Sequence, residues 1–129
     1  MADIGVETMA CILIIEDDAA IRRLLQVNFH ARGYTVMLAS TGQEGLRLIR
    51  EQRPALILVD FRIPDMSGLD LIQHISSDPA TAGIPCVLVT GAAAELLGDI
   101  SAVQGITTII YKPIDLPSLY RTVAELVQR

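Results

Sequence analysis

Five side chains that could do chemistry stand at the ends of short apolar runs. The acids Glu16 and Asp17 follow the run CILII, and Asp60 follows LILV. Thr90 closes the run CVLV, and Lys112 follows TIIY. A short apolar run bounded by turn residues is typical of a strand buried on both faces of a parallel sheet. The carboxyl ends of such strands lie along one edge, where open α/β sheets bind ligands, so we expect these side chains to gather there.

Gathered in this way, the five groups would suit phosphoryl transfer. Crowded carboxylates repel one another, and one of them takes up a proton unless a cation lies among them. A few carboxylate oxygens suit Mg²⁺, which keeps several waters and is completed by phosphate oxygens. Asp60 would attack phosphorus and become an aspartyl phosphate, while Mg²⁺ neutralises the developing charge. The Lys112 ammonium and the Thr90 hydroxyl would each contact a phosphoryl oxygen.

Each feature alone has an ordinary structural explanation. An acidic strand end such as residues 16–18 is most often a solvated turn, and Asp60 alone suits a loop or a helix cap equally well. Lys112 with the proline after it suits any loop, and a threonine such as Thr90 often ends a strand. Only their combination on successive strand–helix units indicates a site.

Five strands and five helices are predicted to position these residues. The apolar runs predict strands at residues 11–15, 34–39, 56–59, 85–89 and 108–111. Helices are predicted after Asp18, from Thr41, and over residues 67–75, 93–103 and 116–128. Strand and helix alternate throughout, which predicts an α/β fold with a parallel sheet and helices on both faces.

Three of the predicted helices have informative sequence details. The first is expected to bury one apolar face and to end at Gly33; that face carries Ile21, Leu24, Leu25 and Phe29. The second begins with the capping-box pair Thr41 and Glu44. The fourth, over residues 93–103, contains Gly98, which costs about 1 kcal/mol against alanine, so we expect it to be marginal.

Composition restricts the class of protein. The 129 residues, 51% hydrophobic and 19% charged, suit one globular domain over residues 10–129, with residues 1–9 as a flexible tail. No apolar run approaches the roughly 18 residues of a membrane span, and the acidic N-terminus is no signal peptide, so a cytoplasmic location is expected. The net charge of −5 argues against direct nucleic-acid binding. Cys11 and Cys86 are expected to be reduced core thiols.

Four motifs along the chain resemble the receiver domain of two-component response regulators. They are ILIIEDD at 12–18, LILVDFRIPDMSGLDLI at 56–72, LVTG at 88–91 and YKP at 111–113. The resemblance covers residues 11–129 and implies a flavodoxin-like fold, a five-stranded parallel sheet of strand order 2-1-3-4-5. It also implies a signalling role in a phosphorelay.

The resemblance also implies a metal site. Glu16 and Asp17 match the acidic pair that holds Mg²⁺ (or Mn²⁺) in the family. Asp60 matches the phosphoacceptor, which is also a metal ligand. The residue two positions later, Arg62, would offer its backbone carbonyl to the metal.

Partners and the switch follow from the same resemblance. The phosphoryl donor would be a sensor histidine kinase or a histidine phosphotransfer protein, and the chain would not be a turnover enzyme. Thr90 matches the switch hydroxyl and Lys112 the family's lysine, whose bond to the next proline is expected to be cis. The fourth helix, fifth strand and last helix would form the face for an output partner or a homodimer. Ile109 departs from the family, which has an aromatic residue there.

Other classes of protein fit less well. A haloacid dehalogenase phosphatase would have a second acid where Arg62 stands, and a flavodoxin would have a hydroxyl-rich or glycine-rich loop in place of residues 16–18. A histidine phosphotransfer protein would be all helical, and His30 and His74 are expected to be structural or exposed. A receiver-like interaction module that is not phosphorylated remains the alternative, although such modules lose the acceptor Asp60 or Lys112. The sequence does not identify the kinase, the signal, the output or any further domain.

Overall fold

A five-stranded parallel sheet forms the centre of the molecule. The computed structural model describes residues 10–91 and 103–128. The strands are β1 (Cys11–Ile15), β2 (Thr35–Ala39), β3 (Leu56–Asp60), β6 (Cys86–Thr90) and β7 (Thr108–Tyr111). Their order is β2-β1-β3-β6-β7, with every neighbouring pair parallel. This confirms the predicted flavodoxin-like order, in which β1 and β3 lie inside the sheet.

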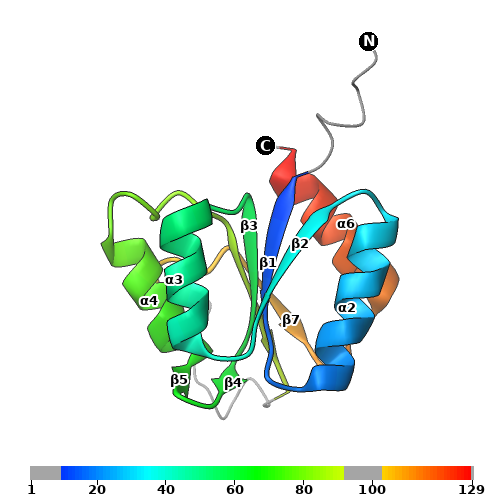
Figure 1. The fold of residues 1–129 in the computed structure, drawn as a ribbon, viewed down its shortest axis with the longest axis horizontal. Coiled ribbons are helices and arrows are strands. Elements are labelled where there is room, and N and C mark those ends of the chain that lie inside the picture. The colour runs from blue at the N-terminus through cyan, green and yellow to red at the C-terminus, as the bar shows by residue number, and fades with distance from the viewer. Residues whose placement is uncertain (1–9, 92–102, 129) are drawn as a thin grey trace.

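Helices cover both faces of the sheet (Figure 1). The described helices are α2 (Ala19–Ala31), α3 (Gly42–Gln52), α4 (Gly68–Ser77) and α6 (Leu116–Val127). Helices α3 and α4 pack on one face, and α2 and α6 pack on the other (Figure 1). None of these described helices is both long and apolar enough to cross a membrane.

The core has two layers because successive strand residues point to opposite faces. In β3, Ile57 and Val59 join the cluster under α3 and α4. Leu56 and Leu58 join the cluster under α2 and α6. Every residue of β3 and of β6 is buried, which explains why both strands read as continuous apolar runs.

The strand register brings the carboxyl ends of the strands to one edge. Ile15 pairs with Val59, so the turn after β1 begins beside Asp60. Asp60 in turn pairs with Val89, and Thr90 pairs with Tyr111. The residues that follow β1, β3, β6 and β7 therefore meet at this edge.

The helices begin directly after that edge, at capping side chains. Asp18 accepts hydrogen bonds from Ala20 N and Ile21 N at the start of α2, and Ser67 accepts one from Asp70 N at the start of α4. The predicted capping box at α3 is confirmed, since Thr41 Oγ1 accepts from Glu44 N at 3.1 Å. The caps fix where each loop of the site stops.

Two features differ from the sequence expectations. Leu24 was predicted to be buried, but its side chain is 48% exposed; its place at the edge of the apolar stripe of α2 turns it outward. A short hairpin, β4 (Arg62–Ile63) and β5 (Met66–Ser67), was not predicted because two-residue strands carry no periodicity. The predicted tail at 1–9 and nearly all of the predicted helix at 93–103 lie outside the described residues.

Candidate functional site

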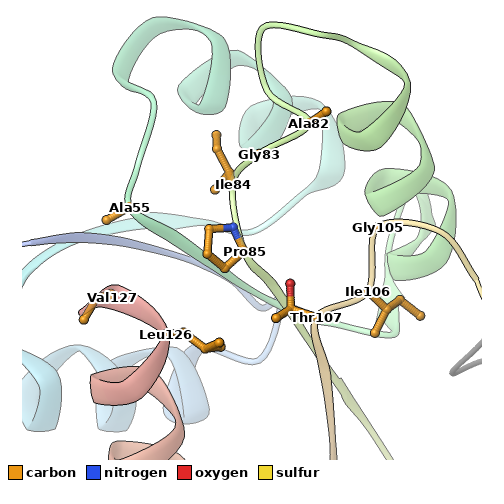
Figure 2. Close-up of a pocket in the computed structure, with 10 residues that line it drawn as sticks. All are labelled: Ala55, Ala82, Gly83, Ile84, Pro85, Gly105, Ile106, Thr107, Leu126 and Val127. Carbon is orange, nitrogen blue, oxygen red and sulfur yellow. The ribbon is translucent and has the colours of Figure 1, made fainter. Parts of the chain in front are cut away.

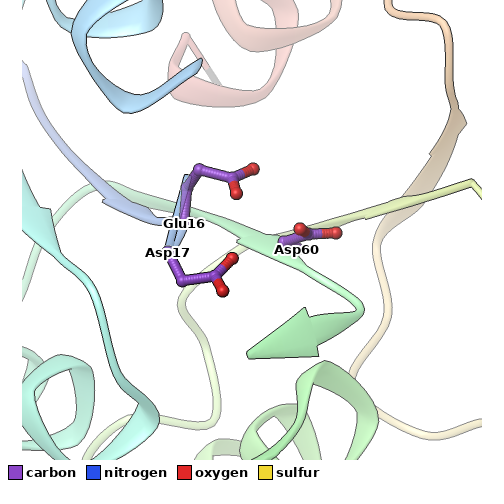
Figure 3. Close-up of side chains that lie close together, drawn as sticks. All are labelled: Glu16, Asp17 and Asp60. Carbon is purple, nitrogen blue, oxygen red and sulfur yellow. The ribbon is translucent and has the colours of Figure 1, made fainter. Parts of the chain in front are cut away.

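Three carboxylates meet where β1 and β3 end. Glu16 and Asp17 follow β1, Asp60 is the last residue of β3, and one carboxylate oxygen from each lies within 4.8 Å of the others. Figure 3 shows the three side chains grouped, with Glu16 and Asp17 projecting from the end of β1 beside Asp60. Glu16 and Asp60 are only 4% and 7% exposed, whereas Asp17 is exposed. The predicted acidic cluster is therefore present and partly shielded from water.

The electrostatics of this cluster favour a bound cation. The pKa of Glu16 is raised to about 7, first by burial and then by the nearby Asp60 and Asp17 charges, against the lowering effects of a hydrogen bond from Asp18 N and of the Lys112 charge. Without a cation the cluster thus retains a proton near neutral pH. The oxygen-only donor set and the crowded negative charge suit a hard divalent cation such as Mg²⁺.

Lys112 reaches into the same site from β7. Its Nζ lies 3.2 Å from Asp60 Oδ2, an ion pair between a half-buried and a buried side chain. Its backbone N donates to Thr90 O at 2.8 Å, which ties it to the end of β6. The Lys112–Pro113 peptide bond is cis, as the resemblance predicted.

A small cavity opens beside Asp60. It has a volume of about 280 Å³ and is lined by Asp60, Phe61, Arg62, Gly91 and Lys112. Arg62 lines this cavity together with Asp60, and the contact of its backbone carbonyl with a metal stays a prediction. Thr90 is fully buried at the end of β6, the strand between those of Asp60 and Lys112. The space suits a group as small as a phosphoryl.

A larger cavity, of about 530 Å³, lies at the opposite edge of the sheet (Figure 2). It is bordered by the segments that lead into β3, β6 and β7 and by the end of α6, with Pro85 and Leu126 among its lining residues. None of its lining side chains titrates, and the Thr107 hydroxyl already accepts a hydrogen bond from Cys86 N at 3.0 Å. The larger cavity therefore lacks the groups that a reaction needs.

The structure adds two residues that the sequence analysis missed. The Arg22 guanidinium donates to Glu16 O at 2.8 Å and to Asp17 O at 3.3 Å, which fixes the acidic turn from the first turns of α2. A positive charge near a helix N-terminus interacts unfavourably with the helix dipole. The position of Arg22 in the sequence therefore could have indicated that it makes a compensating contact. Asp65, in the hairpin, bonds to the N-terminus of α3, a contact too distant in sequence to leave a local pattern.

The remaining candidate residues lie away from the acids. His30 and His74 are exposed in the last turns of α2 and α4, in line with the sequence interpretation. Cys11 and Cys86 are free thiols, although Cys11 is only half-buried. Burial raises the pKa of the Cys86 thiol to about 12, so it stays protonated and unreactive.

Comparison with known proteins identifies the family. The family model of the response regulator receiver domain matches residues 12–124. The polar-differentiation response regulator DivK of Brucella anthropi is 33% identical over 87% of this chain and 91% of its own. The transcriptional regulatory protein GlrR of Escherichia coli is 27% identical over 93% of this chain, which spans only 27% of GlrR.

Solved structures share the fold. The receiver domain protein (CheY-like) of Methanospirillum hungatei JF-1 has a TM-score of 0.86 and 30% identity, covering 94% of this chain and 95% of its own. The chemotaxis response regulator CheY4 of Vibrio cholerae has a TM-score of 0.83 and 26% identity, covering 92% of this chain and 99% of its own. The chain belongs to the response regulator receiver domain family of two-component signal transduction. Members of this family are signalling domains rather than classical enzymes.

Proposed function

We propose that the chain is a phosphorelay receiver that accepts a phosphoryl group on Asp60. The observation that carries this proposal is the position of the Asp60 carboxylate, which lies 3.2 Å from Lys112 Nζ and within 4.8 Å of the Glu16 and Asp17 oxygens. The donor would be a phosphohistidine of a sensor histidine kinase or of a histidine phosphotransfer protein.

The transfer would use this chain's side chains as follows. An Asp60 carboxylate oxygen forms a bond to phosphorus while the phosphorus–nitrogen bond of the donor breaks, and the imidazole leaves with that electron pair and takes up a proton. The Lys112 ammonium leaves its ion pair to contact a phosphoryl oxygen, as a compact charge. The Thr90 hydroxyl donates a hydrogen bond to another phosphoryl oxygen.

The site would hold Mg²⁺ (or Mn²⁺) through Glu16, Asp17, Asp60 and the backbone carbonyl of Arg62. The cation supplies neutralisation of the charge on the transferred group. The oxygen donors and the raised pKa of Glu16 support this assignment.

The donor would dock on an apolar groove next to the site. The groove has a volume of about 260 Å³ and shares Lys112 with the phosphorylation site. Leu24, 48% exposed, lies on its α2 side. The other lining residues are Ile21, Leu25, Pro113, Ile114 and Leu116. A helix that carries a phosphohistidine could bury apolar side chains there while its imidazole reaches Asp60.

We also propose what kind of protein this is, where its domain lies and where in the cell it acts. Asp60 is consumed by the transfer and restored when water hydrolyses the acyl phosphate, so the protein signals without acting as a turnover enzyme. We place the receiver domain at residues 10–129 and the protein in the cytoplasm, without direct binding to nucleic acid or membrane. The module that is not phosphorylated is disfavoured because Asp60 and Lys112 are both present.

Mass spectrometry tests the phosphorylation. Incubation with acetyl phosphate and Mg²⁺ is expected to add one phosphoryl group to the wild type and none to Asp60→Asn. Asp78→Asn is the matched control, because Asp78 is a half-buried aspartate whose described side-chain hydrogen bond is local, from Ala80 N. A mass gain that persists in Asp60→Asn, or that needs no divalent metal, would contradict the proposal.

A further inference from the structure

The hairpin of β4 and β5 begins two residues after Asp60. Arg62 pairs with Ser67 and Ile63 with Met66, so residues 64 and 65 form the tip. At the base, Gly68 N donates to Phe61 O at 2.7 Å and closes the loop. The hairpin carries Arg62 into the lining of the Asp60 cavity.

The tip of the hairpin is bonded to another element. The Asp65 carboxylate accepts from Gly42 N at 2.7 Å and from Gln43 N at 2.9 Å, the first two amides of α3. These are charge-assisted bonds at the positive end of a helix dipole. The two bonds lower the pKa of Asp65, so the carboxylate stays ionised at neutral pH.

Helix α3 has its own local cap, which leaves only these two amides for Asp65. Thr41 Oγ1 accepts from Glu44 N, and Glu44 Oε1 accepts from Ser40 N at 3.0 Å. The hairpin approaches α3 closely at position 42, where a Cβ would lie 2.6 Å from Met66 Cγ and would displace the Met66 side chain. The contact thus joins two segments about twenty residues apart in the sequence.

The turn before α3 is also bonded to the acidic cluster. Glu16 N donates to Ala39 O at 3.0 Å, at the end of β2. The segment from Ala39 to Gly42 is therefore hydrogen-bonded to Glu16 on one side and to the tip of the Arg62 hairpin on the other. These hydrogen bonds therefore connect the acidic turn, the start of α3 and the hairpin to one another.

We propose that Asp65 is a positioning residue for the metal site. By fastening the hairpin to α3, it holds the Arg62 backbone at a fixed place relative to Glu16 and Asp60. Asp65 touches neither the metal nor the phosphoryl group. This inference rests on the proposed function, because it requires the acidic cluster to bind a divalent cation.

Metal titration of matched variants tests the inference. Mn²⁺ binding, followed by the electron paramagnetic resonance signal of the free ion, is measured for the wild type, Asp65→Ala and Asp65→Asn. Asp65→Ala is expected to raise the Mn²⁺ Kd about tenfold, the lower end of the loss that follows removal of an outer partner of a metal site. Asp65→Asn keeps one acceptor oxygen, so its Mn²⁺ Kd is expected to lie between those of the wild type and Asp65→Ala.

Thr41→Ala is the control that separates positioning from helix stability. It removes a cap from the same end of α3 but leaves the hairpin bonded, so stability should fall while the Mn²⁺ Kd stays that of the wild type. Backbone NMR shifts of residues 62–68 are expected to move in Asp65→Ala and not in Thr41→Ala. Equal Mn²⁺ affinity in wild type and Asp65→Ala, or equal weakening by Thr41→Ala, would overturn the inference and leave the proposed function intact. A wild type that binds no Mn²⁺ would overturn both.

Discussion

The cost of burying charge decides how each acidic residue of the site behaves. Glu16 and Asp60 are almost fully buried within 4.8 Å of Asp17, with the single ammonium of Lys112 beside them. Burial is the main reason that the pKa of Glu16 rises to about 7, and the charges of Asp60 and Asp17, which the single Lys112 ammonium does not balance, add to it. Metal binding and proton release are therefore coupled at Glu16.

Mg²⁺ binding below about pH 7 is expected to release a proton from Glu16. In the metal-free protein Glu16 keeps its proton up to about pH 7, but it must ionise to act as a ligand. Calorimetry in buffers of different ionisation enthalpy should give roughly one proton released near pH 6 and close to none above pH 8. Glu16→Gln should remove this dependence. A wild-type binding enthalpy that does not depend on the buffer at pH 6 would contradict the assignment.

The same pKa shift has a consequence for stability without metal. In the unfolded chain Glu16 titrates near its ordinary value of 4.5, whereas in the folded protein the value is about 7. The folded state therefore binds the proton more tightly, and the resulting stability is fully present below pH 4.5. It is lost as pH rises towards and through 7. The difference between wild type and Glu16→Gln in urea titrations at pH 5 and pH 8 isolates this contribution.

At the scale of the elements, the apolar patterns predicted the strands of the parallel sheet and the described helices, but not the hairpin or every contact. The strand 108–111 was predicted with its observed bounds, because apolar run and turn residues delimit it clearly. Leu24 was placed wrongly because spacing alone cannot tell the centre of an apolar stripe from its edge. The hairpin was missed because its stability comes from Asp65 and from Gly68 N, not from a local pattern.

Leu24→Ala is expected to slow transfer from a protein donor without slowing transfer from acetyl phosphate. Leu24 lines the groove that also contains Lys112, whereas Val27, 49% exposed on the same helix, lines a different hollow. Truncating an exposed apolar contact in an interface should slow transfer about fivefold. The measurement is the rate of phosphotransfer from a cognate histidine kinase, which is first identified by testing candidate kinases for transfer to this protein. Val27→Ala is the matched control. Equal rates for the two variants would place the donor elsewhere.

For the whole molecule, the sequence determined the topology more completely than the site. Right-handed crossovers and buried central strands leave few arrangements, so the order of the sheet could be predicted. That order brings Asp60 and Lys112 together from positions far apart in the chain. The proton on Glu16 and the contact of Asp65 with Gly42 depend on packing in three dimensions. Neither has a signature in a single stretch of sequence.

Phosphorylation is expected to change the face that contains β7 and α6. Lys112 Nζ contacts Asp60, and Lys112 N is bonded to Thr90 O, so charge added at Asp60 acts on the ends of β6 and β7 together. Thr90 pairs with Tyr111, which is 46% exposed and offers a surface to an output partner or a second copy. Ile109 has the confined side chain of a β-branched residue, so we expect a graded change instead of a rotation between two states.

Hydrogen exchange with beryllofluoride and Mg²⁺, as a phosphoryl mimic, checks this expectation. Protection should change over residues 103–111 and along α6, and it should stay constant in α2 and α3. The predicted fourth helix belongs to the same proposed face, and nearly all of it lies outside the described residues. Asp60→Asn, whose neutral amide cannot replace the carboxylate that binds the mimic, is the control and should show no change. Changes confined to α2 and α3 would instead place the output face on the β1–β2 side of the molecule, because those helices pack mainly on β1 and β2.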